Sequence, residues 1–262
     1  IDISEPSLEV ARELAEQYQL SNIEHRQGDL LELDEVAQYD VIQSIGVIHH
    51  LSDPQRGLNR LQRALKDSGV MIIWLYHPFG ERERLQQRKL LHVLWGEKRD
   101  DLALGEQLMK ALDLQLDTGH YGPRTLGSDE LAGNADAYMH PIVEAYELGP
   151  ALDMVRESGC TWAAVDFLTI RWGMKFVNLA EVSDPVAPTS LVEASLRAAY
   201  NLRVSDILTD ESLHDRFRAL SKREQLAIIE LVVNPRGFQI VAGMGTSYER
   251  FNPRICGNVI EF

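Results

Sequence analysis

Residues that could take part in chemistry gather where the predicted strands of this sequence end. They are Asp2, Asp29, the run Ser44–Leu51 with its neighbouring His49 and His50, and the pair Tyr76 and His77. Carboxylates and hydroxyls hydrogen-bond polar ligands, and imidazoles exchange protons near neutral pH. These residue types therefore predict a site that binds a polar ligand and can move a proton.

A second set of polar residues lies further along the chain and comprises Asp136, Tyr138, His140, Glu144 and Tyr146. The spacing of Asp136 and His140 places both on one face of a helix, provided that the helix extends that far. Such a pair could be a base with its orienting acid, a metal pair, or a histidine that is only hydrogen-bonded at a helix end. A third metal ligand is not evident, so we expect no metal.

Strand and helix patterns alternate over about the first hundred residues. The strand patterns are Ile1–Ile3, Ile23–Gln27, Tyr39–Ile45 and Val70–Leu75. Helix patterns follow the caps Ser4 and Ser52-Asp53-Pro54, and the second runs from about Gln55 to Leu65 before a turn at Asp67-Ser68-Gly69. This alternation predicts an α/β fold with a doubly wound, mostly parallel sheet. Ligands of such sheets bind beyond the carboxyl ends of the strands, where the first set of polar residues lies.

The rest of the chain is predicted to be mostly helical. Helices are expected at Gly80–Arg99, Leu104–Leu116, Asp129–Tyr138, Pro150–Ser158, Leu191–Asn201, Asp210–Leu220 and Gln225–Val233. Thr161–Leu168 is a strand pattern, and Phe238–Ala242 can complete the sheet as its last, antiparallel member. We expect a core over 1–103, a helical insertion or lid over 104–147, the end of the core sheet over 148–182 and a mostly helical C-terminal appendage over 183–262.

Four segments, in order along the chain, resemble motifs of the class I S-adenosylmethionine-dependent methyltransferases. They are Ile1-Asp2-Ile3-Ser4, Gly28-Asp29-Leu30, Tyr39-Asp40-Val41-Ile42, and Gly46-Val47-Ile48-His49-His50-Leu51-Ser52-Asp53-Pro54. Each segment alone is common, but the four in order, with helices between them, form a specific combination. The resemblance covers roughly residues 1–77. It implies a Rossmann-like fold with S-adenosyl-L-methionine as the cofactor.

The resemblance also implies roles at the ends of the first two strand patterns. Asp2, beside Ile3, would accept hydrogen bonds from both ribose hydroxyls, because a carboxylate has two accepting oxygens. Asp29 would accept from the adenine amino group, and the backbone N–H of Leu30 would face a ring nitrogen. These residues are the expected binding site for the nucleoside part of the cofactor.

The methionine end of the cofactor is expected beside the next strand end. The resemblance places Ser44 and Gly46 along it, where a missing Cβ lets the ligand approach closely. Ile45 and Val47 would pack beside the sulfonium. Methyl transfer from a sulfonium is an in-line displacement with a good leaving group, so positioning and desolvation can supply much of the catalysis. A base is needed only where the acceptor must lose a proton.

The histidines near this point have two open interpretations. His49 or His50 contacts the methyl acceptor or acts as a base, or both bond to the backbone and close the floor of the cofactor site. Tyr76 and His77 have the same alternatives. In the family, insertions between the fifth and sixth strands shape the acceptor pocket, so the residues from 136 to 146 are the expected acceptor-side residues.

The family's glycine-rich loop after its first strand is absent from this sequence and would lie upstream of Asp2. Gly243-Met244-Gly245 is a weak substitute, because a lone glycine pair without a following helix has little specificity. We therefore expect the native chain to continue before Ile1 with a strand, a glycine loop and a helix.

The helix expected over Gly80–Arg99 is locally basic. It is either a lid that attracts an anionic substrate or a solvated helix face.

Composition narrows the choice of partners. The 262 residues have a formal net charge of −14, which argues against a general nucleic-acid binder. No apolar run is long enough to span a membrane. Two cysteines, Cys160 and Cys256, are too few for a disulfide framework and favour a reduced, cytoplasmic protein. A small-molecule acceptor is the expected partner, and the oligomeric state is not indicated.

The sequence therefore predicts a methyltransferase that acts on a small molecule. Two other classes stay open: a non-catalytic binding module with the same fold, and a nucleotide-dependent dehydrogenase. A dehydrogenase sheet also places an acid at the ribose, but it fits the Gly28-Asp29-Leu30 turn and the run 46–54 less well.

Overall fold

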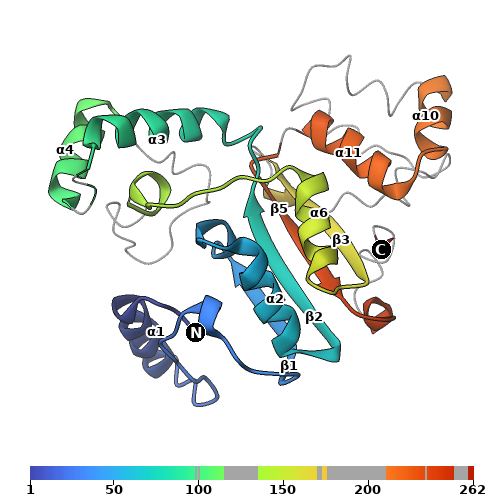
Figure 1. The fold of residues 1–262 in the computed structure, drawn as a ribbon, viewed down its shortest axis with the longest axis horizontal. Helices are drawn as coiled ribbons and strands as arrows, with labels where there is room; N and C mark the ends of the chain where they lie inside the picture. Colours follow the sequence, from blue (N-terminus) through green and yellow to red (C-terminus); the bar gives the residue numbers. More distant parts are fainter. Residues whose placement is uncertain are drawn as a thin grey trace.

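A six-stranded mixed sheet organises the chain, with helices arranged around it (Figure 1). The computed structural model describes residues 1–97, 99, 101–114, 135–169, 173–175, 211–233, 235–250 and 259–262. Three expectations lie outside these residues: the helix over 191–201, the first half of the helix over 129–138, and Cys256.

The strands follow the spatial order β1-β2-β5-β3-β4, with β6 paired to β3. They are β1 (Tyr39–Ile45), β2 (Leu65–Tyr76), β3 (Trp162–Thr169), β4 (Gly173–Lys175), β5 (Gly237–Gly243) and β6 (Ile260–Glu261). β1 and β2 pair in parallel, whereas β5 runs antiparallel between β2 and β3. The α/β class and the antiparallel strand at 238–242 are confirmed, but this strand is not the last member of the sheet, because β5 lies between β2 and β3 and β6 follows it along the chain. Because β5 separates two strands that run the same way, the sheet is more mixed than the alternation predicts.

Most expected helices are present. They are α1 (Glu5–Gln17), α2 (Pro54–Ala64), α3 (Arg82–Trp95), α4 (Leu102–Ala111), α6 (Leu148–Glu157), α10 (Glu211–Arg218) and α11 (Lys222–Val233). Short 3-10 turns occur at η1 (Leu30–Glu32), η2 (Ile48–His50) and η6 (Ser247–Arg250), and a π-helical turn at η4 (Ala135–Met139). Side-chain caps begin them as expected: Ser4 caps α1 and Asp53 caps α2. Ser221 and Glu224 form a capping box at α11.

Opposite faces of the sheet pack against different parts of the chain. Met71, Ile73 and Leu75 of β2 belong to the main core, which includes residues of α2, α6 and α11. In Figure 1, α2 and α6 lie side by side over this face. The alternate residue Val70 packs with Trp162 on the other face. Side chains therefore cover β2 on both faces around residues 70 and 71.

One turn was predicted wrongly. Gly69 was expected to end a helix, but α2 ends at Ala64 and β2 begins at the next residue. Residues 66–69 form an irregularity in the pairing of β1 with β2, which shifts between Tyr39 and Val41. A Cβ on Gly69 would lie 2.9 Å from the carbonyl oxygen of Asp40, so the glycine allows a close strand approach.

The segment before β1 contributes little to the sheet. Only Gln27 of the strand expected at 23–27 pairs, through a parallel bridge to Asp2. No strand in the described part of the chain pairs with the outer edge of β1, where Val41 and Ile45 are exposed.

α3, α4 and η4 form a separate small core that contains Leu91. Across the described segments, no helix is long and apolar enough to cross a bilayer.

Candidate functional site

The carboxyl ends of β1 and β2 lie next to each other, and a distant segment crosses them. The amide of Glu144 donates to the carbonyl of His49 at 3.0 Å. The amide of Tyr146 donates to the carbonyl of Tyr76 at 2.9 Å. Residues 142–146 are thereby held across both strand ends. The structure thus brings together part of each polar set that the sequence predicts.

A pair of histidines is the centre of this junction. The ring centroids of His50 and His140 are 3.9 Å apart. Nδ1 of His50 and Nδ1 of His140 lie 2.7 and 2.6 Å from the carbonyl oxygen of Ile142. A carbonyl oxygen can only accept, so Nδ1 of His50 carries a hydrogen and this ring, when neutral, keeps its lone pair on Nε2. Nδ1 of His140 also lies 3.2 Å from the amide nitrogen of Ile142, but its shorter contact with the carbonyl oxygen assigns a hydrogen to Nδ1 of this ring as well. Within the described residues neither Nε2 has a hydrogen-bond partner, so both can accept a proton.

Burial keeps His50 neutral at physiological pH. It lowers the pKa of His50, the bond to the Ile142 carbonyl raises it, and His140 lowers it further. A half-buried, neutral imidazole with an open Nε2 has the properties of a general base. The geometry therefore favours the first of the two interpretations for His50.

His49 has a different environment. Its side chain is 0% exposed, and neither ring nitrogen has a hydrogen-bond partner within the described residues. The ring packs on Tyr76 with centroids 4.1 Å apart and near Trp74 at 5.6 Å. Burial, with the nearby charges of His50, Arg84 and His140, lowers the pKa of His49 to about 2. Such a weak base suits the floor of the site and not proton transfer at neutral pH.

Asp136 does not orient His140. The turn η4 ends at Met139, so His140 leaves the helix before the two side chains can share a face. No hydrogen bond or ion pair joins them in the structure as described, and Nδ1 of His140 bonds to Ile142 instead. Asp136 is exposed, and its charge raises the pKa of His50.

Tyr146 and Glu144 form a second polar pair on the crossing segment. The Tyr146 hydroxyl donates to Oε2 of Glu144 at 2.5 Å. Burial and the neighbouring carboxylate raise the pKa of Tyr146. Tyr146 therefore keeps its proton at neutral pH and donates it in the hydrogen bond to Glu144, so toward a ligand it can act as a hydrogen-bond acceptor or an apolar wall.

His77 is engaged on both ring nitrogens. Its side chain is buried, Nε2 donates to Oε1 of Glu230 at 2.6 Å, and Nδ1 accepts from the amide of Phe79 at 3.1 Å. Glu230 also accepts from the amide of Leu148 at 2.6 Å, so one carboxylate of α11 holds the end of β2 and the start of α6. Sequence reasoning missed Glu230, although it shares the apolar face of its helix with Leu226.

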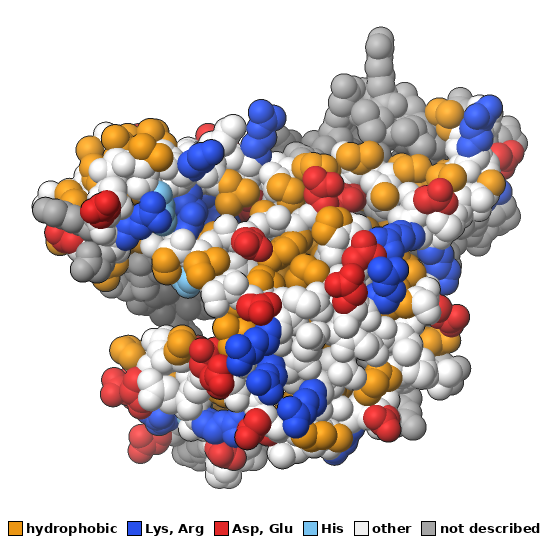
Figure 2. All heavy atoms as spheres, in the orientation of Figure 1, with side chains coloured by type: hydrophobic (Ala, Val, Ile, Leu, Met, Phe, Trp, Pro, Cys, Tyr) orange, Lys and Arg blue, Asp and Glu red, His pale blue; other side chains and the backbone are white. Residues whose placement is uncertain are grey.

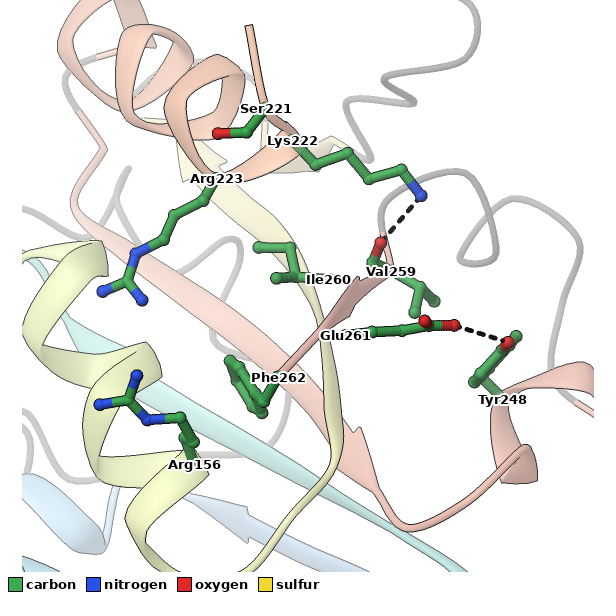
Figure 3. Close-up of a pocket in the computed structure, with 9 residues that line it drawn as sticks. All are labelled: Arg156, Ser221, Lys222, Arg223, Tyr248, Val259, Ile260, Glu261 and Phe262. Carbon is green, nitrogen blue, oxygen red and sulfur yellow. Dashed lines mark hydrogen bonds between the residues drawn. The ribbon is translucent and has the colours of Figure 1, made fainter.

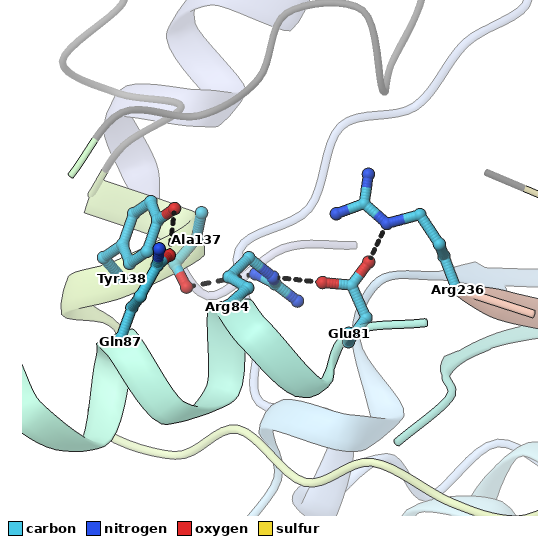
Figure 4. A network of polar contacts seen from close by, with 6 residues as sticks. All are labelled: Glu81, Arg84, Gln87, Ala137, Tyr138 and Arg236. Atoms are coloured by element: carbon cyan, nitrogen blue, oxygen red, sulfur yellow. Dashed lines mark hydrogen bonds and ion pairs between the residues drawn. The ribbon is translucent and has the colours of Figure 1, made fainter. Parts of the chain in front are cut away.

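A buried ionic network connects this region to α3 (Figure 4). Glu81 accepts a hydrogen bond from Nε of Arg84 and forms an ion pair with the guanidinium of Arg236, and all three side chains are buried. Arg84 also donates to the carbonyl of Ala137 at 3.0 Å and stacks over Tyr76, with 4.3 Å between its guanidinium carbon and the ring centroid. This network fixes α3 and η4 against the end of β2. The sequence signalled only the basic character of the helix.

The expected nucleoside-binding residues are also adjacent. The amide of Gly28 donates to the carbonyl of Asp2 at 2.9 Å, which places Asp29 beside Asp2. One oxygen of Asp2 accepts from the amide of Ser4 at 2.8 Å, and one of Asp29 from the amide of Leu31 at 2.8 Å. Both carboxylates are exposed, so the second oxygen of each is available to a ligand.

The end of β1 has space and an unsatisfied group for a ligand. The hydroxyl of Ser44 is buried and has no hydrogen-bond partner in the described structure. Gly46 has a φ of +72°, and a Cβ there would meet nothing within 4 Å. Ile45 and Val47 are exposed at the same end. The expected cofactor residues therefore fit a polar ligand that bears hydroxyl and amino groups.

Two other features lie away from this site. The turn after Gly243 is at the opposite edge of the sheet, because Gly243 pairs with Val70 at the amino end of β2. It leads into η6, so it is not a cofactor loop. A cavity of about 640 Å³ lies at the start of α11, lined in part by Arg156, Arg223 and Glu261 (Figure 3). Glu261 pairs with the first residue of β3, so this cavity also lies at the far edge.

The described residues offer neither a metal-binding cluster nor a reactive cysteine. No group of three or more His, Cys, Asp or Glu side chains among them is placed to hold a metal ion. Burial raises the pKa of the Cys160 thiol to about 11, so this cysteine is not an activated nucleophile.

Known proteins resemble the chain in sequence. Residues 1–103 match a family model described as a methyltransferase domain. An uncharacterized protein of Synechococcus is 28% identical over 242 residues, which are 88% of this chain and 50% of that protein. A ubiquinone biosynthesis O-methyltransferase of Acinetobacter baylyi is 38% identical over 71 residues, 26% of this chain and 30% of that one.

Solved structures share the fold. PKMT2 of Rickettsia typhi has a TM-score of 0.50 at 13% identity, covering 94% of this chain and 43% of that chain. A second structure of the same protein, in complex with AdoHcy, has a TM-score of 0.50 at 14% identity, covering 94% and 44%. The chain spans half or less of the length of these relatives.

Proposed function

We propose that this chain, whose residues 1–103 form a class I S-adenosylmethionine-dependent methyltransferase domain with a Rossmann-like fold, transfers a methyl group from S-adenosylmethionine to a small-molecule acceptor. The observation that carries the proposal is the meeting of two sites at one edge of the sheet. The candidate cofactor residues end at Gly46, and His50, whose ring stacks on that of His140, lies four residues further along the chain.

The chain's own residues suit the cofactor. Asp2 has a free carboxylate oxygen for the ribose hydroxyls, and Asp29 has one for the adenine amino group. The buried Ser44 hydroxyl and the open space at Gly46 suit the polar methionine end. When bound, the cofactor supplies a methyl group on a sulfonium, whose sulfur keeps the electron pair of the broken bond.

His50 and His140 account for the acceptor's proton. A hydroxyl or amine of the acceptor, hydrogen-bonded to Nε2 of either ring, gives its proton to that nitrogen as its own electron pair bonds to the methyl carbon. The ring then becomes an imidazolium whose Nδ1–H still donates to the Ile142 carbonyl. This carbonyl therefore orients the base and stabilises its charged form.

Charge and chemistry favour a small acceptor in the cytoplasm. The net charge of −14 opposes binding of a polyanion. Cys160 is a buried free thiol, which is typical of proteins in a reducing compartment.

Calorimetric titration of the full-length protein tests the proposal. S-adenosylhomocysteine should bind with a one-to-one stoichiometry, and NAD should not. Incorporation of labelled methyl groups from S-adenosylmethionine into small molecules should then depend on His140. Binding of NAD alone would overturn the proposal in favour of a dehydrogenase.

A further inference from the structure

Two arginines of α3 face the candidate acceptor side of the site. Arg84 stacks over Tyr76, and Arg88 donates to the backbone carbonyl of His140. His140 in turn stacks on His50. These contacts form one continuous cluster from α3 to the end of β1. Figure 2 shows Lys and Arg side chains along α3 beside a histidine, above a hollow that separates this surface from that of α1.

Carboxylates of this region make their contacts with groups other than Arg88. Glu81 is shared between Arg84 and Arg236, and Glu144 accepts from the hydroxyl of Tyr146. Within the described residues, Arg88 has no carboxylate partner, and its buried Nε has no hydrogen-bond partner. A partly buried charge without a counter-ion is costly, so an anion that reaches Arg88 gains both a hydrogen bond and charge neutralisation.

Neighbouring positive charges also favour an anion at Arg88. Burial, together with the charges of Arg84 and Arg99, lowers the pKa of Arg88 to about 10. Like charges held this close repel one another, and an anion placed between them relieves the repulsion. Asp136, another carboxylate near this cluster, is exposed and acts on His50.

We propose that the methyl acceptor carries an anionic oxygen group, a carboxylate or a phosphate, that Arg88 binds while the acceptor's nucleophile meets the pair of His50 and His140. Arg88 is hydrogen-bonded to the backbone carbonyl of His140, so an anion bound to the Arg88 guanidinium lies close to the pair of histidines. A planar guanidinium fits two oxygens of either group. The inference rests on the proposed function, because it assigns the acceptor's chemistry at that same site.

Binding of simple probes to the full-length protein tests the inference. Benzoate and inorganic phosphate are titrated separately, each with and without S-adenosylhomocysteine, and the histidine ring signals are followed by NMR. Benzamide, which has the shape of benzoate without its charge, is the neutral control. Benzoate or phosphate should bind saturably and shift the His50 and His140 signals, and benzamide should bind about tenfold more weakly or not at all. Whichever of benzoate and phosphate binds more tightly identifies the anionic group of the acceptor as a carboxylate or a phosphate.

Variants separate anion binding from packing. Arg88→Met should weaken binding of the anion about tenfold or more, and Arg88→Lys should retain part of it because the charge stays. Lys89→Met, on the exposed side of the same helix, should change nothing. Equal binding of benzamide and benzoate, or unchanged anion affinity in Arg88→Met, would overturn the inference. Failure of S-adenosylhomocysteine to bind would instead overturn the proposed function, and the titrations of the anions without S-adenosylhomocysteine would still test the inference.

Discussion

His50 and His140, far apart in the sequence, share one hydrogen-bond acceptor. Their Nδ1 atoms lie 2.7 and 2.6 Å from the carbonyl oxygen of Ile142, and their rings are in contact. One backbone atom therefore sets the tautomer of both rings and exposes the same nitrogen, Nε2, on each. The candidate base is a pair of rings with a common orientation.

Removing either ring should slow the reaction without loosening the cofactor. We expect His140→Ala and His50→Ala each to lower kcat about 10²-fold or more, the usual contribution of a general base. The affinity for S-adenosylhomocysteine should stay at the wild-type value, since neither ring belongs to the cofactor residues. His25→Ala, on the loop between α1 and η1, is the control and should keep full turnover. Unchanged turnover in both site variants would return these histidines to a purely structural role.

Asp2 should control cofactor affinity. Asp2→Ala removes the available carboxylate oxygen beside Asp29 and should weaken binding of S-adenosylhomocysteine about tenfold to a hundredfold, the range expected for hydrogen bonds to a charged group. Calorimetry of full-length protein measures the change. Glu9→Ala, exposed on α1, is the matched control. If the affinity of the Asp2 variant equals that of the control, the ribose assignment is wrong.

Glu81 should be important for stability. Glu81→Ala leaves the guanidiniums of Arg84 and Arg236 buried beside each other without their shared carboxylate. Breaking a buried pair in this way costs about 3–5 kcal/mol of unfolding free energy. Urea denaturation checks the value. Glu83→Ala, exposed on the same helix, should change it by less than about 0.5 kcal/mol. A Glu81 variant as stable as Glu83→Ala would contradict the role of the network.

Acid should destabilise the protein partly through His49. The pKa of this ring is lowered to about 2 in the folded state, against its usual value of 6.5. The unfolded chain therefore binds an extra proton between these two pH values, so the free energy of unfolding falls as the pH drops below 6.5. One such group contributes at most about 1.4 kcal/mol per pH unit. His49→Gln should flatten the dependence measured by urea denaturation between pH 7 and pH 5, and an unchanged slope would exclude this cause.

Local patterns predicted the elements and the strand ends well. Apolar strand patterns placed β1, β2 and β5, and side-chain caps placed α1 and α2, because these signals act within a few residues. The adjacency of Asp2 and Gly28 follows from strands whose carboxyl ends meet at one edge. The fold class and the family resemblance were accessible for the same reason.

The inner geometry of the site depends on contacts between distant segments. The bond from His77 to Glu230 spans 153 positions, and that from His50 to Ile142 spans 92. No local pattern encodes such pairs. Asp136 and His140 illustrate the converse: their spacing suited a helix, but the turn ends one residue too early for them to meet.

The shared acceptor at Ile142 has a consequence for mutational scanning. The group that orients both imidazoles is a peptide carbonyl, and every amino acid supplies one. An alanine scan through residues 142–146 would therefore leave it in place and report the position as tolerant. Replacing the amide bond between Ile142 and Val143 by an ester makes the Ile142 carbonyl a poorer acceptor. This substitution would expose the contribution of the carbonyl to the orientation of both rings.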